Sequence, residues 1–160
     1  MYAEPAGALV RRATQDDLEA LSELVYRFYV FNEEFDPSWS AVQNLRDLAT
    51  QHAAELVKSQ DSVVLVAVKD GKVVGYVMAV MEENRLIKAR RLLVIKELYV
   101  RPQERRQGIA TLLINSVLDE ARKSKVSYVA VEYPAANTIA GDIYLKMGFR
   151  PHLVRLIKEV

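Results

Sequence analysis

The stretch SVVLVAVKDGKVVGYVMAVMEE, residues 62–83, restricts the fold of this chain more than any other part of the sequence. It consists of two runs rich in β-branched residues, and Asp70-Gly71 separates them. Asp-Gly between two such runs is the strongest short-range signal for a β-hairpin. A further strand, RLLVIKELYV at 91–100, follows behind a polar loop. The sequence therefore predicts three consecutive antiparallel strands in the middle of the chain.

A short strand and two helices are predicted before the hairpin. The strand is expected at 7–13, and apolar residues then recur at helical spacing over 18–28. The segment FNEEFDPSW, 31–39, contains Asn, Asp and Pro and is predicted to be a loop. The second helix is expected from about 40 to 58.

Helices and strands alternate after the hairpin. We expect a helix at about 108–123, a strand at 127–134 and a short helix at 137–148. The last segment, FRPHLVRLIKEV at 149–160, is predicted to form one or two strands. The helix that precedes the 127–134 strand allows this strand to lie parallel to its predecessor through a right-handed crossover. The fold class is therefore α+β, with a single domain over residues 1–160.

The composition excludes several classes of site and partner. The chain has no cysteine and only two histidines, His52 and His152, which argues against a disulfide and against a thiolate or multi-histidine metal centre. A net charge of +1 gives no reason to expect nucleic acid. No apolar run approaches the ~20 residues of a membrane span, and the start MYAEPAGALV lacks a signal-peptide pattern. We therefore expect a cytoplasmic protein with no metal, no nucleic-acid partner and no membrane partner.

A charged turn within VRPQERRQGIA, 100–110, lies between a strand and the next helix. Pro102 stops the strand, and the amides of 105–110 precede a helix, where they lack internal partners and the helix dipole adds positive potential. Gly108 has no side chain, so a ligand can approach the backbone closely. These features favour an anion site, with a phosphate or pyrophosphate as the natural ligand. A basic surface turn is the alternative explanation.

The pattern Arg105-x-x-Gly108-x-Ala110 resembles the Q/R-x-x-G-x-G/A signature of acetyl-CoA-binding N-acetyltransferases of the GNAT superfamily. It also follows a strand that ends in V-x-P, as in that family. The stretch VEYPAANTIAGDIYLKMGF, 131–149, is similar to the family's second signature. The resemblance extends over the whole order of elements and is strongest over 92–150. Ala110 stands where many members have a second glycine, a variant that the pattern allows.

The resemblance implies a fold and a co-substrate. The implied fold is a mixed central sheet of six to seven strands, flanked by about four helices and splayed between the strands at 91–100 and 127–134. Acetyl-CoA is expected to wedge into this gap, with no metal involved. The residues that the resemblance places around it are Leu98, Tyr99 and Val100 at the pantetheine arm, Arg105, Arg106, Gln107, Gly108, Ile109, Ala110 and Thr111 at the pyrophosphate, and Asn137 on the other side.

Tyr144 is the expected general acid. The thiolate that leaves when an amine attacks a thioester needs a proton or a hydrogen bond, and a phenol supplies either at neutral pH. Its position within the second signature, between Asn137 and Gly148-Phe149, supports this assignment. Packing of a buried aromatic is the alternative.

Glu97 and Glu132 are the two candidates for the base that neutralises the amine. Glutamates are depleted in strand interiors, so each of them calls for a reason. Some family members use a glutamate at a place like Glu97 and others one at a place like Glu132. Strand alternation does not say whether the two share a face, and a charge on an exposed sheet surface is the alternative for each.

The acceptor site is expected at the link between the first two helices, which borders the acceptor cleft in the family. Its candidate residues are Phe31, Glu33, Glu34 and Phe35. Carboxylates near aromatic rings attract a cationic amine, which could be a polyamine, a lysine or a protein N-terminus. A solvated acidic loop is the alternative.

The sequence thus predicts an N-acetyltransferase that moves acetyl from acetyl-CoA to a primary amine, small molecule or protein, in a direct ternary complex. A non-catalytic acyl-CoA-binding regulatory module is the first alternative. A nucleic-acid-binding domain that uses Arg101, Arg105 and Arg106 is the second, and the near-zero net charge disfavours it. A homodimer is also open, because family members are often dimers.

Overall fold

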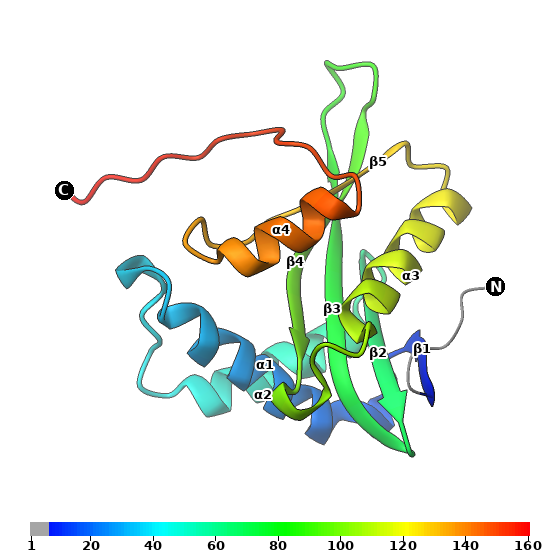
Figure 1. The fold of residues 1–160 in the computed structure, drawn as a ribbon, viewed down its shortest axis with the longest axis vertical. Helices are drawn as coiled ribbons and strands as arrows, with labels where there is room; N and C mark the ends of the chain where they lie inside the picture. The colour runs from blue at the N-terminus through cyan, green and yellow to red at the C-terminus, as the bar shows by residue number, and fades with distance from the viewer. Residues whose placement is uncertain (1–6) are drawn as a thin grey trace.

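The computed structural model describes residues 7–160, and residues 1–6 lie outside that range. Over the described residues, its centre is a five-stranded sheet in the order β1-β2-β3-β4-β5 (Figure 1). Strands β1 to β4 are antiparallel to their neighbours, and β5 is parallel to β4, as predicted. The strands are β1 (Ala8–Arg12), β2 (Ser62–Lys69), β3 (Lys72–Glu83), β4 (Arg91–Val100) and β5 (Tyr128–Val131). The predicted hairpin joins β2 to β3, with Asp70 at φ 51° and Gly71 at φ 73° as its two left-handed turn residues.

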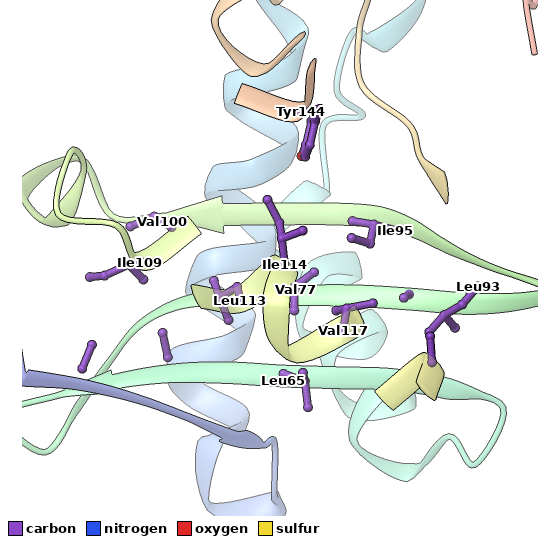
Figure 2. Close-up of a cluster of buried hydrophobic side chains, with 14 of the residues drawn as sticks. Leu65, Val77, Leu93, Ile95, Val100, Ile109, Leu113, Ile114, Val117 and Tyr144 are labelled. Atoms are coloured by element: carbon purple, nitrogen blue, oxygen red, sulfur yellow. The ribbon is translucent and has the colours of Figure 1, made fainter. Parts of the chain in front are cut away.

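Two layers of helices cover the sheet, one on each face (Figure 1). The helices are α1 (Leu18–Glu33), α2 (Leu45–Lys58), α3 (Ile109–Lys123) and α4 (Thr138–Lys146). Leu21 and Leu24 of α1 and Ala53 of α2 pack on one face of the sheet. Leu113 and Val117 of α3 pack on the other, as Figure 2 shows. Within residues 7–160, no helix is long and apolar enough to cross a membrane.

The sheet has five strands over the described residues, so the expectation of six to seven is wrong. The missing strands are those predicted within 149–160, a segment that has no regular structure and runs away from the sheet (Figure 1). Leu153 is 79% exposed and Leu156 is 89% exposed. The sequence has β-forming character there, but a strand also needs a neighbour for its backbone hydrogen bonds, and in this structure the segment pairs with no strand of residues 7–160.

Three element boundaries also differ from the predictions. Helix α1 continues to Glu33, although 31–39 was expected to be a loop throughout. Asn32 is buried, and its side-chain amide donates to the Phe28 carbonyl one turn earlier at 2.7 Å. The helix itself thus supplies the hydrogen-bond partner that this buried polar residue needs. Helix α2 begins at Leu45 rather than near 40, and β5 ends at Val131.

Candidate active site

Strands β4 and β5 pair briefly and then part. The pairing ends with Ile95 beside Val131, and a last hydrogen bond joins the Glu132 N–H to the Ile95 carbonyl oxygen at 3.0 Å. Strand β4 continues to Val100 with β3 as its one neighbour. The backbone of Leu98–Val100 therefore lies along a gap in the sheet, where the splay was predicted.

The turn between β4 and α3 presents main-chain donors directly after this gap. Arg106 has φ 63° and Gly108 has φ 81°, so both are left-handed. Gly108 is the N-cap of α3, and its carbonyl accepts from the Leu112 N–H at 3.0 Å. The N–H groups of 109–111 come before that first helical bond and have no acceptor within the helix. Helix starts with free N–H groups of this kind can bind anions, so the turn leaves the predicted anion site open as a prediction.

Two long side chains of the turn, Arg105 and Gln107, contact the protein itself. The Nε of Arg105 donates to the Val100 carbonyl at 3.0 Å, and its guanidinium lies 5.0 Å from the centre of the Phe31 ring. The Oε1 of Gln107 accepts from Nζ of Lys69 at 2.9 Å. Arg106 is exposed, so the turn offers an anion its main chain and the Arg106 side chain.

Tyr144 lies on α4 and points toward β4 from the α3–α4 side of the sheet (Figure 2). Its side chain is buried between Tyr133 and Phe149, with ring centres 5.4 and 5.7 Å away. Burial, with a smaller effect of Tyr133, raises the pKa of the Tyr144 phenol. The group therefore keeps its proton at neutral pH, as a proton donor must. Asn137 caps the same helix, since its Oδ1 accepts from the Ala140 N–H at 3.2 Å.

Glu97 lies on the opposite, α1–α2 face of the sheet as a buried carboxylate with three partners. The hydroxyl of Tyr76 donates to Oε1 at 2.8 Å. Nε2 of His52 lies 2.8 Å from Oε2, and the Tyr29 hydroxyl donates to the same oxygen at 3.4 Å. The three partners come from β3, α2 and α1, so packing of both helices on the sheet assembles the cluster. Their hydrogen bonds offset the cost of burying a carboxylate that is 3% exposed.

The pKa values of the three partners of Glu97 are all raised. The hydrogen bond to Glu97 raises the pKa of His52, although burial opposes the shift. Burial, aided by the charge of Glu97, raises the pKa of Tyr29 to about 12. The same causes raise the pKa of Tyr76 well above its ordinary value. Both phenols therefore remain donors across the physiological pH range.

Glu132, the other predicted base, has different surroundings. It lies just beyond β5, its side chain is half exposed, and its Oε1 accepts from Nζ of Lys96 at 2.8 Å. Lys96 also pairs with Glu82 at 3.1 Å. Lys96 is the extra residue of a β-bulge in β4, because Glu97 pairs with Met78 while Ile95 already pairs with the next residue of β3. Glu132 is thus held by a surface ion pair, whereas Glu97 lies inside the fold.

An open pocket of about 370 Å³ lies between α1, α2 and the segment that joins them. Tyr29, Trp39 and His52 line it, together with the aliphatic residues Val25, Val42, Leu45 and Leu48. The Tyr29 ring stacks on Trp39 with centres 6.1 Å apart and meets His52 edge-on at 6.5 Å. Because Tyr29 and His52 also bind Glu97, the pocket borders the buried carboxylate cluster. Of the described residues, no aspartate, glutamate, lysine or arginine lines it.

The four residues expected at the acceptor site do not line this pocket. Phe31 and Phe35 contact each other edge to face at the end of α1, with ring centres 5.1 Å apart. The carboxylate of Glu33 accepts from the Ala41 N–H at 2.6 Å and so ties α1 to the segment before α2. Glu34 is exposed. Across residues 7–160, no three histidine, cysteine, aspartate or glutamate side chains gather in a way that could hold a metal ion.

The model of the acetyltransferase (GNAT) family matches residues 18–149 of the chain. That range contains the gap between β4 and β5, the turn before α3 and Tyr144. The chain belongs to the GNAT family.

Similar proteins carry this GNAT fold across a wide sequence distance. An uncharacterized N-acetyltransferase of Methanocaldococcus jannaschii is 28% identical over 94% of the chain, which spans 66% of that protein's length. The solved structure of a tetramutant of the BH1408 protein from Bacillus halodurans has a TM-score of 0.84 at 19% identity and covers 95% of this chain and 99% of its own. Aminoglycoside N-acetyltransferase AAC(6')-Iy, solved in complex with CoA, has a TM-score of 0.75 at 16% identity and covers 100% and 99%.

Sequence reasoning missed the three partners of Glu97: His52, Tyr29 and Tyr76. Each occurs within a regular helical or strand pattern, and nothing local marks it as a partner of Glu97. The one available signal was that His52 falls on the apolar, inward side of its predicted helix, where an imidazole needs a polar partner.

Replacing Tyr76 with phenylalanine tests the carboxylate cluster. The change removes one of the donors to a buried carboxylate and keeps the ring, so the free energy of unfolding should fall by about 1–3 kcal/mol. Urea denaturation at pH 7 measures it. Tyr128→Phe, at a residue 53% exposed on β5, is the matched control and should change stability by less than about 0.5 kcal/mol. Equal effects of the two substitutions would contradict the cluster as described.

Proposed function

We propose that this chain is an acetyl-CoA-dependent N-acetyltransferase with a single domain, which transfers acetyl to a primary amine by direct attack in a ternary complex. The observation that carries the proposal is the gap between β4 and β5, with the donor-rich turn of α3 directly after it. A co-substrate with a diphosphate and an amide-containing arm fits such a corner. The CoA complex of AAC(6')-Iy, which has the same fold, supports this choice.

The residues present fit acetyl-CoA. Beyond Ile95, the side of β4 that faces away from β3 has no strand beside it, so the backbone at Leu98 and Tyr99 has room there for hydrogen bonds from a pantetheine arm. The main chain of Arg105–Thr111 offers donors to a pyrophosphate, and Gly108 presents no side chain in the way. Asn137 keeps its amide NH₂ available, because its Oδ1 is the half that caps α4. When bound, acetyl-CoA supplies the thioester carbonyl that the amine attacks.

Tyr144 is the proposed general acid. It lies on the face of the sheet opposite Glu97, so the acid and the base candidate approach the gap from its two sides. A buried phenol with a raised pKa stays protonated and can donate to a developing thiolate.

The geometry favours Glu97 over Glu132 as the carboxylate that takes part in deprotonation. Glu97 belongs to the cluster that borders the pocket, whereas Glu132 is engaged by Lys96 at the protein surface. The ion pair with Lys96 holds the Glu132 side chain at the surface, away from the residues that line the pocket.

The pocket between α1 and α2 is the proposed acceptor site. Its walls are aromatic and aliphatic, which suits an amine that carries an apolar group, such as an arylalkylamine or the N-terminus of a peptide with an apolar first residue. Phe31, Glu33, Glu34 and Phe35 remain candidates for the outer part of an acceptor, beyond the pocket wall.

Gly108→Ala tests the co-substrate site. At φ 81° a side chain at position 108 strains the backbone, and this strain would move the N–H groups at the start of α3. CoA affinity, measured by isothermal titration calorimetry, should therefore fall about tenfold or more, which corresponds to roughly 1.4 kcal/mol. Gly71→Ala is the control, because Gly71 has a similar φ of 73° in the hairpin turn between β2 and β3. It should lower stability and leave CoA affinity unchanged. Equal CoA affinity for Gly108→Ala and the parent protein would refute the placement.

Tyr144→Phe tests the reaction. We expect kcat to fall about 100-fold, as for loss of a general acid, with little change in CoA affinity. Release of free CoA thiol is followed with 2-phenylethylamine, spermidine, a lysine-containing peptide and a peptide with a free N-terminus. The cysteine-free chain contributes no thiol background. Full turnover by Tyr144→Phe rules out the acid assignment, and CoA binding without thiol release from any amine indicates a regulatory module instead.

A further inference from the structure

Glu97 is too enclosed to meet an acceptor amine directly. It is 3% exposed, and its oxygens accept from Tyr76, Tyr29 and His52. A substrate that reached either oxygen would have to displace one of these partners. Glu97 can therefore influence a molecule in the pocket only through a neighbouring side chain that lines the pocket.

His52 is that neighbour. Its side chain is 32% exposed, it lines the pocket, and its Nε2 lies 2.8 Å from Oε2 of Glu97. An ionised carboxylate only accepts hydrogen bonds, so Nε2 carries the hydrogen and Nδ1 holds the lone pair of the neutral ring. Glu97 thereby fixes both the tautomer and the orientation of the imidazole, in the way that carboxylates orient histidine bases in other enzymes.

We propose that His52 is the base that takes the proton from the acceptor amine, and that Glu97 is its positioning residue. The proposal rests on the acetyltransferase function proposed above. The ammonium group gives one proton to the lone pair of His52, and the free amine keeps the electron pair that attacks the acetyl carbonyl. The resulting imidazolium is stabilised by the ionised Glu97 beside it, and it returns the proton to solvent through the open pocket.

The groups around His52 set the pH at which this base works. Glu97 from β4, Tyr29 from α1 and Glu55 from α2 itself face or influence the ring, and Tyr76 from β3 lies behind Glu97. The two phenols stay neutral, so the charges that act on the ring are the carboxylates. They raise the pKa of His52, with the hydrogen bond to Glu97 as the largest cause. Neutral His52 is the active form, so activity should be lost as the pH falls through this raised pKa.

NMR titration of the imidazoles tests the pair without any need for turnover. The chain has two histidines, and the signal of exposed His152 serves to assign that of half-buried His52. We expect the His52 midpoint to lie above the ~6.5 of a free imidazole, and Glu97→Gln to lower it. Glu55→Gln, which removes a charge but no hydrogen bond, should lower it less. A wild-type His52 midpoint at or below ~6.5, or a Glu97→Gln variant without effect, overturns the proposal.

The pH profile of kcat/KM with 2-phenylethylamine and saturating acetyl-CoA tests the role of the base. The acidic limb should move to lower pH in Glu97→Gln and should vanish in His52→Gln, with a rate loss of about 100-fold at neutral pH. Glu55→Gln is the control and should keep near-wild-type turnover. An unchanged limb in His52→Gln overturns the proposal. If the wild-type protein acetylates no amine of the panel, the proposed function fails, and the role of His52 as base fails with it. The NMR titration would still show whether Glu97 raises the pKa of His52.

Discussion

The end of backbone pairing between β4 and β5 at Ile95 is the constraint on which the rest of the site depends. A strand that keeps its partner to the end has no unused donors or acceptors to offer. Here β4 runs on to Val100 beside β3 alone, and the turn that follows leads into the unpaired amides of α3. One interruption in the sheet therefore produces both an extended edge and a cluster of donors, in consecutive parts of the chain.

The sheet also separates two kinds of chemistry. Its α3–α4 face carries Tyr144 in an apolar surrounding, where burial keeps a phenol protonated. Its α1–α2 face carries Glu97, whose burial is tolerable because three side chains from three elements bind it. If the two groups shared one face at close range, the carboxylate charge and the phenol would perturb each other directly.

The parts of the structure that were predicted correctly are those with local causes. The Asp70-Gly71 turn, the end of β4 before Pro102 and the start of α3 at Gly108 each follow from a few adjacent residues. The partners of Glu97 could not be predicted in this way, since His52 is 45 residues distant and meets it only when α2 packs on the sheet. The prediction for the tail failed for the opposite reason: its local sequence favours a strand, but strand formation also depends on non-local pairing, and the tail does not pair with the sheet in this structure.

The pocket and the turn before α3 belong to different parts of the chain. Trp39 and Val42 line the pocket from the segment between α1 and α2, whereas the turn lies between β4 and α3. Substitutions at sites that share no contacts are close to additive in their effects. If the pocket receives the acceptor as proposed, acceptor preference can diversify through one short connecting segment while the main-chain donors of the turn stay intact.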